Sequence, residues 1–283
     1  SQGSWIVAPT TASEHPEPPP AGGQALVAKL LETLTAHPDV WAKTVFILNY
    51  DENDGFFDHV PPPVPAITPA MGKSTIAVTG EIYKGEPVGL GPRVPMLIIS
   101  PWTKGGFVNS EVFDHTSVIR FLEARFRVAE PNITPWRRAI CGDLVSAFDF
   151  TAADKYSGSG AVLPDTGDYV AKVTAARGLP PAVPMLTGGL PVQEKGQRPA
   201  RPLPYVLEVT GSIGNDLFAL TIVNQGTAGA CLTVYADDDT PRFYTCGVGQ
   251  TLTDRLPVTA GNRGFRVHGP NGFLRIFANA APA

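Results

Sequence analysis

An apolar run that stops at a cluster of acids constrains the fold of this chain more than any other stretch. Residues 45–48 are Val, Phe, Ile and Leu, a block typical of a strand buried on both faces of a parallel sheet. Four polar residues follow where that strand should end: Asp51, Glu52, Asn53 and Asp54. Ligands of open α/β sheets bind beyond the carboxyl ends of the strands, so this position favours a functional site.

Adjacent carboxylates repel each other unless a cation or a shared proton relieves the repulsion. We therefore expect Asp51 and Glu52 to hold a divalent metal ion with oxygen ligands. A solvated acidic loop is the alternative that the same residues allow. Asn53 and Asp54 are expected either to contact substrate or to fix the turn through hydrogen bonds from side chain to backbone.

The loop after the acids is expected to turn back on itself. Gly55 tolerates the backbone conformations that a sharp turn requires. Phe56 and Phe57 are then expected to anchor the loop, so that Asp58 and His59 return toward the same crevice. Residues 44–60 thus predict a strand, a turn and a polar site in that order.

The segments on either side of this stretch fit an α/β fold. Apolar residues at helical spacing predict a helix over residues 24–36, and residues 94–100 read as a second buried strand. The intervening loop, residues 61–93, is long and Pro-rich. Loops of that length are usually functional or mobile, so we expect this one to line the mouth of the site.

A further helix is predicted over residues 116–126, where apolar side chains again share one face. Asp114 or Thr116 is its expected N-cap. The N–H groups at a helix start suit a phosphate, and capping does not account for His115. We therefore place His115 in the site, as an acid, a base or a phosphate contact.

Beyond this helix the character of the chain changes twice. A short helical piece begins at Trp136, and its arginines, Arg137 and Arg138, are expected to have surface and packing roles. Residues 151–203 are rich in Gly, Pro and Ala, as expected of a connector that wraps around the surface.

The last part of the chain reads as all-β. Short runs with period-two alternation and turn residues between them predict seven strands. These runs lie at residues 205–210, 217–223, 231–236, 242–245, 251–256, 264–268 and 273–277. Asn271 and Gly272 are a strong hairpin signal between the last two. We expect three parts: an α/β region at residues 1–150, a connector at residues 151–203 and a small antiparallel β-sandwich at residues 204–283.

Composition excludes some classes of protein. With 43% hydrophobic and 17% charged residues in a chain of 283, the sequence can bury a core. A net charge of -4 gives no field that would draw nucleic acid. No apolar run reaches the roughly 18 residues of a membrane span. Cys231 and Cys246 fall a hairpin apart, so a disulfide and buried free thiols are both open.

Four sequence motifs together resemble one family. They are SWIVAP and SEHP near the start, DENDGFFDHVPPP after the first strand, and GFVNSEVFDHTSVIRFLE before and within the helix predicted over residues 116–126. They resemble the bacterial phospholipases C of the phosphoesterase family, which also contains certain acid phosphatases. The resemblance implies an α/β fold: part of an alkaline phosphatase-like α/β/α sandwich, followed by a small all-β antiparallel sandwich as accessory domain.

The resemblance also assigns roles. It implies that Asp51 and Glu52 bind the metal and that His15 and His115 lie around the phosphate. Alone, His15 reads as an exposed loop histidine; by resemblance it binds phosphate or protonates the leaving oxygen.

Two neighbouring residues receive a supporting role. Asp58 and His59 are expected to orient the residues that act on the substrate. The implied reaction is metal-assisted hydrolysis of the phosphodiester of phosphatidylcholine- or sphingomyelin-type lipids at a hydroxyl nucleophile.

The family's Glu-Asn metal pair and its Ser or Thr nucleophile have no counterpart in these residues. We therefore expect an N-terminal half of the same enzyme as partner, and a chain that is inactive by itself. The family implies a secreted or periplasmic bacterial protein with a phospholipid substrate. Two alternatives stay open: a phosphomonoesterase of the acid phosphatase type, and a non-catalytic fragment whose β-domain binds lipid, glycan or protein.

Overall fold

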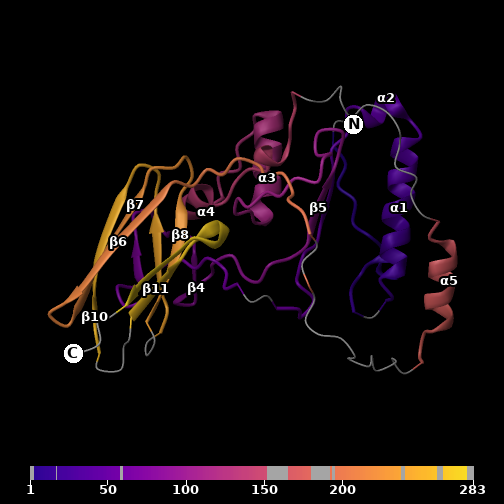
Figure 1. Ribbon diagram of the computed structural model, residues 1–283. Coiled ribbons are helices and arrows are strands. Elements are labelled where there is room, and N and C mark those ends of the chain that lie inside the picture. The colour runs from indigo at the N-terminus through magenta and orange to yellow at the C-terminus, as the bar shows by residue number, and fades with distance from the viewer. Residues whose placement is uncertain are drawn as a thin grey trace.

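The structure is a computed structural model, and it describes residues 3–16, 18–57, 60–151, 165–179, 192, 195–236, 240–259 and 264–278. A mixed region of helices and strands comes first, and an antiparallel β region follows at the C-terminal end. Figure 1 shows the β region at one side of the molecule and helices α1 and α5 at the other. The two regions were expected from the sequence.

The described helices are mostly those predicted. They are α1 (Ala21–Thr35), α2 (Pro38–Trp41), α3 (His115–Phe126), α4 (Pro135–Ile140) and α5 (Gly167–Ala175), with 3-10 turns at Thr10–Ala12, Val145–Ala147 and Pro270–Gly272. Helices α1 and α3 begin and end close to the predicted bounds, and α4 begins one residue before Trp136, where its start was predicted. Helix α5 was not predicted: it lies within the expected connector and contacts α1.

Two strands form a short ladder in the first region. Strand β1 (Phe46–Asn49) pairs with β5 (Met96–Ile99), with Phe46 opposite Ile99. Both strands were predicted, but the expectation of a parallel sheet buried on both faces is wrong for the described residues. The pairing is antiparallel, and β1 is only half-buried. An apolar run reports the tendency to be buried and carries no information about the direction of the neighbouring strand.

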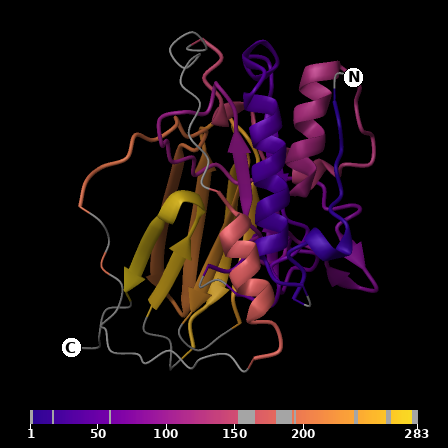
Figure 2. The same cartoon turned by 90° about the vertical axis from the view of Figure 1, so that its right-hand side faces the viewer.

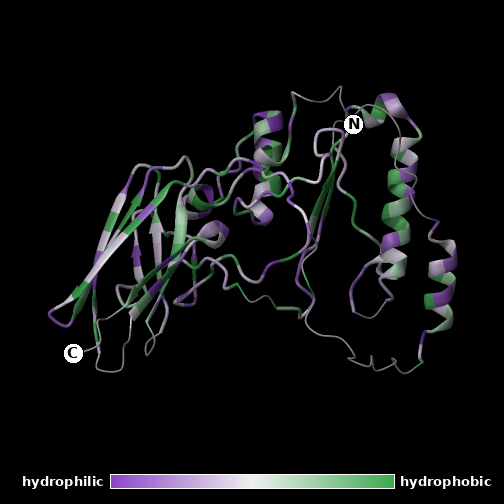
Figure 3. Ribbon diagram, in the orientation of Figure 1, coloured by the Kyte–Doolittle hydropathy of each residue, from purple (hydrophilic) through white to green (hydrophobic). Residues whose placement is uncertain are grey.

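Helix α3 packs on one face of this ladder. Val118 of α3 is buried with Leu144 and Phe148, and Ile47 and Ile98 of the ladder pack against them. Figures 1 and 2 show α1 and α3 as separate helices beside the ladder, with α1 on the side away from the β region. Figure 3 shows apolar residues along the ladder and along α1. Burial of these apolar faces is what holds the first region together.

All seven predicted C-terminal strands are present. They are β6 (Leu207–Gly214), β7 (Leu217–Asn224), β8 (Ala230–Ala236), β9 (Arg242–Cys246), β10 (Thr251–Pro257), β11 (Gly264–His268) and β12 (Leu274–Ala278). One sheet has the order β10-β7-β6, and the other runs β12-β11-β8-β9. Strands β11 and β12 form the hairpin that Asn271 and Gly272 predicted.

The two sheets share one apolar core. It contains buried residues from both sheets: Val209, Phe218, Leu220, Ile222, Ala230, Leu232, Val234, Tyr244, Cys246, Leu252, Leu256, Phe265 and Val267. The rings of Phe218 and Phe265 stack across the core with centroids 4.2 Å apart. These residues sit at alternate positions along their strands, which is why the period-two pattern revealed the strands.

The loop at residues 61–93 is not a simple site-lining loop. It contains β2 (Gly72–Ser74), β3 (Ile82–Tyr83) and β4 (Glu86–Pro87), and β2 adds to the five-stranded sheet parallel to β9. A Cβ on Gly72 would lie 2.0 Å from the carbonyl oxygen of Phe243, and Gly72 has φ of 127°. Only glycine therefore allows this close pairing.

Helix α4 joins the first region to the outer face of this sheet. The Trp136 indole Nε1 donates to Thr245 Oγ1 at 2.9 Å, and both residues are fully buried. The Gly229 N–H donates to the Ala139 carbonyl at 2.8 Å. All three cysteines lie among the described residues and are free thiols, so the disulfide left open for Cys231 and Cys246 is not formed.

Within the part of the chain that the structure describes, no helix has the length and apolar character needed to cross a membrane.

Candidate functional site

The acidic residues after β1 form a tight turn. Asn53 Nδ2 donates to the Phe56 carbonyl at 2.7 Å, and the Phe56 N–H donates to the Asn53 carbonyl at 3.0 Å. Asp54 and Gly55 both have positive φ, 52° and 75°. The Asn53 side chain thus makes the kind of hydrogen bond to the backbone that one of its two expected roles requires. Asp51, a candidate metal ligand, is exposed at the start of this turn.

Tyr50 joins three of the motifs that the sequence singled out. Its hydroxyl donates to Glu14 Oε2 at 2.5 Å, and its carbonyl accepts from His115 Nε2 at 2.9 Å. Because a carbonyl can only accept, Nε2 carries the proton in this contact. Burial, together with the Glu14 carboxylate, raises the pKa of Tyr50 to about 12. Tyr50 thus stays neutral and connects the loop that carries His15, the acidic turn and the start of α3.

The two candidate histidines come from different elements. His15 is exposed and follows Glu14, so the bond from Tyr50 to Glu14 holds its loop near the acidic turn. His115 is the first residue of α3, and Asp114 precedes the helix as its N-cap. Glu14 and Tyr50 were not among the predicted site residues, although Tyr50 lies between the predicted strand and the acidic residues, and Glu14 lies inside the SEHP motif.

Local contacts set the start of α3. The Asp114 N–H donates to Ser117 Oγ at 3.0 Å, and Thr116 Oγ1 donates to Asp114 Oδ1 at 2.6 Å. Asp114 is therefore the N-cap, and Thr116, the other residue proposed as cap, supports it. The first turn of this helix presents N–H groups and the positive end of the helix dipole beside His115.

Two arginines of α4 contact acidic residues at the two ends of α3. Arg137 donates to Asp114 and Glu81, and Arg138 pairs with Glu123 near the other end of α3. The expected surface and packing roles did not include the ion pairs that Arg137 forms with two buried carboxylates. Sequence reasoning missed this cluster because its members come from three separate segments of the chain.

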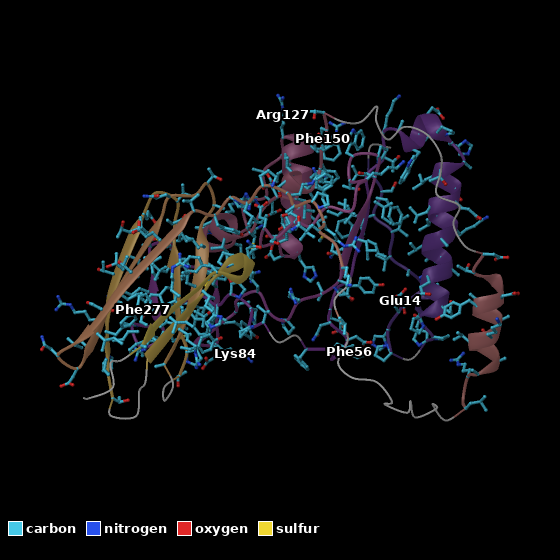
Figure 4. All side chains as sticks on the ribbon, viewed as in Figure 1. Glu14, Phe56, Lys84, Arg127, Phe150 and Phe277 are labelled. Carbon is cyan, nitrogen blue, oxygen red and sulfur yellow. The ribbon has the colours of Figure 1, made fainter. Side chains whose placement is uncertain are left out.

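Some predicted site features are not assembled. Phe56 and Phe57 are each 79% exposed, so they do not anchor the loop as expected. A buried ring needs apolar neighbours, and neither apolar cluster of the first region includes a residue of this turn. In Figure 4, Glu14 and Phe56 lie toward the part that carries α1 and β5, away from Phe277 in the β region. Asp58 and His59 lie outside the described residues.

A cavity of about 490 Å³ lies beside the first turns of α3 and contains none of the predicted site residues. Its wall includes Thr116 and Ile119 of α3 and the charged pair of Glu81 and Arg137. The acidic turn and both candidate histidines are absent from its lining. It is therefore separate from the chemistry predicted for the end of β1.

The residues described here do not fit a metal ion without further ligands. Among them, no group of three or more His, Cys, Asp or Glu side chains is placed to hold one. Asn49 Oδ1, at the end of β1, is a buried acceptor with no hydrogen-bond partner among the described residues. Asp51 and Glu52, in the turn that follows β1, are exposed. An isolated pair of exposed carboxylates binds a metal ion weakly.

Two regions of the chain match known families. Residues 2–129 match the Phosphoesterase family, and residues 199–278 match the bacterial phospholipase C, C-terminal domain. The first match contains every candidate site residue. The second contains strands β6 to β12 of the C-terminal region.

Three bacterial relatives align with almost the whole chain. A non-hemolytic phospholipase C of Pseudomonas aeruginosa is 49% identical over 98% of this chain, and one of Burkholderia pseudomallei is 46% identical over 100% of it. A hemolytic phospholipase C of Pseudomonas aeruginosa is 45% identical over 98% of this chain. The chain spans 42% of the length of each of these relatives.

Proposed function

This chain belongs to the bacterial phospholipase C family, and we propose that it is the C-terminal portion of an enzyme that hydrolyses the phosphodiester of phosphatidylcholine- or sphingomyelin-type lipids. The observation that carries this proposal is the pair of contacts made by Tyr50. They gather the loop of His15, the acidic turn and the start of α3 around the end of one strand. These are the segments in which the family resemblance placed the site.

We assign the first region to part of an alkaline phosphatase-like α/β/α sandwich. The support is the β1–β5 ladder, with α3 packed on one face and α1 on the side away from the β region. We assign residues 204–283 to a small antiparallel sandwich that serves as an accessory domain, with residues 151–203 as the connector. The core shared by the two C-terminal sheets supports that assignment.

In this proposal His115 and His15 act on the phosphate. Since His115 Nε2 donates to the Tyr50 carbonyl, Nδ1 is the ring nitrogen that remains for the substrate. A protonated Nδ1 would donate to a phosphoryl oxygen or to the leaving alkoxide. The nearby helix N-terminus favours the negative charge of the diester. His15 binds the same phosphate or protonates the leaving oxygen.

The two carboxylates after β1 are assigned the metal-binding role that the sequence suggested. We propose that Asp51 and Glu52 supply two ligands of a divalent metal site whose other ligands, like the hydroxyl nucleophile, come from outside these residues. A bound divalent ion would supply a Lewis acid for the phosphoryl oxygens. Asp54, together with Asn53, is proposed to contact the head group. Because the ligand set described here is incomplete, we expect no turnover from this chain alone.

Two residues outside the described structure complete the assignment. Asp58 and His59 are proposed to orient the side chains that act on the substrate. The relationship to bacterial phospholipases C is also the basis for proposing a secreted or periplasmic location.

The proposal is tested by the turnover of a phosphocholine diester and of a simple phosphomonoester by the full-length enzyme. We expect hydrolysis of the diester, loss of that activity in Asp51→Asn, and wild-type activity in the control Asp39→Asn, which alters an exposed acid on α2. Preference for the monoester would favour the phosphatase alternative. Absence of any turnover would favour the non-catalytic alternative, in which the β region binds lipid, glycan or protein.

A further inference from the structure

We propose that Arg137 is a positioning residue of this site, which holds the start of α3, and with it the ring of His115, through Asp114. The expected effect on turnover rests on the proposed function. The positioning of His115 rests on the contacts alone. Arg137 lies on α4, outside the residues matched by the Phosphoesterase family.

The guanidinium of Arg137 has three partners. Nη1 donates to Asp114 Oδ2 at 2.7 Å. Nε and Nη2 donate to the two oxygens of Glu81 at 2.8 and 3.1 Å, a bidentate arrangement that fixes the plane of the group. Nη2 also donates to the Gly89 carbonyl at 2.6 Å. One side chain therefore ties α4, the loop at residues 61–93 and the start of α3 to each other.

The burial of this cluster makes the arginine necessary. The side chains of Glu81 and Asp114 are 1% and 6% exposed, and that of Arg137 is 17% exposed. Two carboxylates with so little access to water depend on the shared guanidinium for compensation of their charge. A lysine in its place would carry the charge but lacks the planar fork that reaches both partners at once.

Glu81 is itself held in place from α4. Thr134, the N-cap of α4, donates from Oγ1 to Glu81 Oε1 at 2.6 Å and accepts from the Arg137 N–H at 3.2 Å. The carboxylate that binds the guanidinium is thus itself held by the N-cap of α4. Contacts with Thr134 and with the Gly89 carbonyl therefore hold the Glu81–Arg137 pair in addition to the contact with Asp114.

The contact with Asp114 transmits that position to the site. Asp114 and His115 are consecutive residues at the start of α3, and the His115 ring reaches the Tyr50 carbonyl at 2.9 Å. Release of the Asp114 carboxylate would free the cap and change the direction of the adjacent ring. Displacements of about 1 Å in such positions reduce turnover on the order of 100-fold.

The same helix provides a matched control. Arg138 also links α4 to α3, with bonds of 3.0 and 2.8 Å to the carboxylate of Glu123, but that residue lies far along α3 from His115. Arg137→Gln and Arg138→Gln each remove one charged link between the same two helices. Only the first removes a link to the residue before His115.

We would measure kcat and KM of the full-length enzyme for a phosphocholine diester. Arg137→Gln is expected to lower kcat by about 10-fold to 100-fold with KM within about twofold of wild type, while Arg138→Gln keeps wild-type kcat. Arg137→Lys keeps the charge and Asp114→Asn keeps the size, and they test the same link if Arg137→Gln does not fold. Arg137→Lys should recover part of the lost kcat. Equal kcat in the Arg137 and Arg138 variants would overturn the proposal.

The ring of His115 provides a readout independent of turnover. In protein labelled with ¹⁵N-histidine, its signals are identified by their loss in His115→Gln. We expect Arg137→Lys and Asp114→Asn to move these signals and Arg138→Gln to leave them in place. Unmoved signals in both variants would overturn the inference whatever the activity. Moved signals in an enzyme that hydrolyses no phosphodiester would support the positioning and reject the proposed function.

Discussion

Replacement of Trp136 by Phe is expected to destabilise the chain, because this residue links the first region to the C-terminal sheets. Its indole is fully buried and donates to Thr245 Oγ1 at 2.9 Å. Phenylalanine keeps an aromatic ring but removes the donor and part of the volume. Thr245, also fully buried, then loses this hydrogen bond without access to water.

The expected magnitude follows from these two losses. A buried hydroxyl that loses its partner costs about 1–3 kcal/mol. The void left by the smaller ring, roughly 40 Å³ at about 24 cal/mol per Å³, adds about 1 kcal/mol. The sum is about 2–4 kcal/mol. At about 2 °C per kcal/mol for a large domain, Tm should fall by about 4–8 °C.

The assay is urea unfolding of four proteins that form a double-mutant cycle: wild type, Trp136→Phe, Thr245→Val and the double variant. We expect the two residues to be coupled by about 1–2 kcal/mol, since the second replacement removes the stranded partner. Trp5→Phe is the control, because Trp5 is 73% exposed and its replacement should change stability by less than about 0.5 kcal/mol. Additive effects of the two buried replacements would refute the reasoning.

Two further perturbations test other links in the fold. Gly72→Ala should lower the free energy of unfolding by about 2 kcal/mol or more, because it forces strain at positive φ and a clash with the adjacent strand. Gly214→Ala, with open space around it, should lower it by less. Equal urea midpoints of the two variants would contradict this. Hydrogen bonds from Arg138 lower the pKa of Glu123 to about 2, so its contribution is present above about pH 4.5 and lost as pH falls through about 2. In urea unfolding at a series of pH values, the wild type should therefore be more stable than Glu123→Gln near neutral pH and equally stable at the acid end. Glu32→Gln is the exposed control. A wild-type advantage that persists below pH 2 would argue against the pair of Glu123 and Arg138.

The sequence predicted elements whose signal is local. The seven C-terminal strands were predictable because inward and outward residues alternate along each of them. Helix α3 and its cap at Asp114 were also predictable from local signals, because the cap and the apolar face lie within a few turns of each other. The order of segments in the candidate site also followed from motifs that lie close together in the chain.

Long-range pairing was beyond that signal. Strand β2 pairs with β9 across about 170 residues, so nothing inside the loop at residues 61–93 marked it as part of a sheet. The antiparallel direction of β1 and β5 was not predicted for the same reason, since neither strand alone carries information about its partner. Arg137 binds residues 23 and 56 positions away, and only the folded chain brings them together. The role of Tyr50, which contacts residues 36 and 65 positions away, was hidden in the same way.

The most direct measurement for the proposed function is the kcat of His115→Gln for a phosphocholine diester, in the full-length enzyme. His37→Gln is the matched control, because His37 is exposed after α1 and lies in none of the proposed site segments. A group that transfers a proton or binds the phosphate in the transition state contributes about 10²-fold to 10⁴-fold, so kcat should fall by at least about 100-fold in His115→Gln alone. Equal kcat in the two variants would contradict the assignment of the site to the end of β1 and the start of α3.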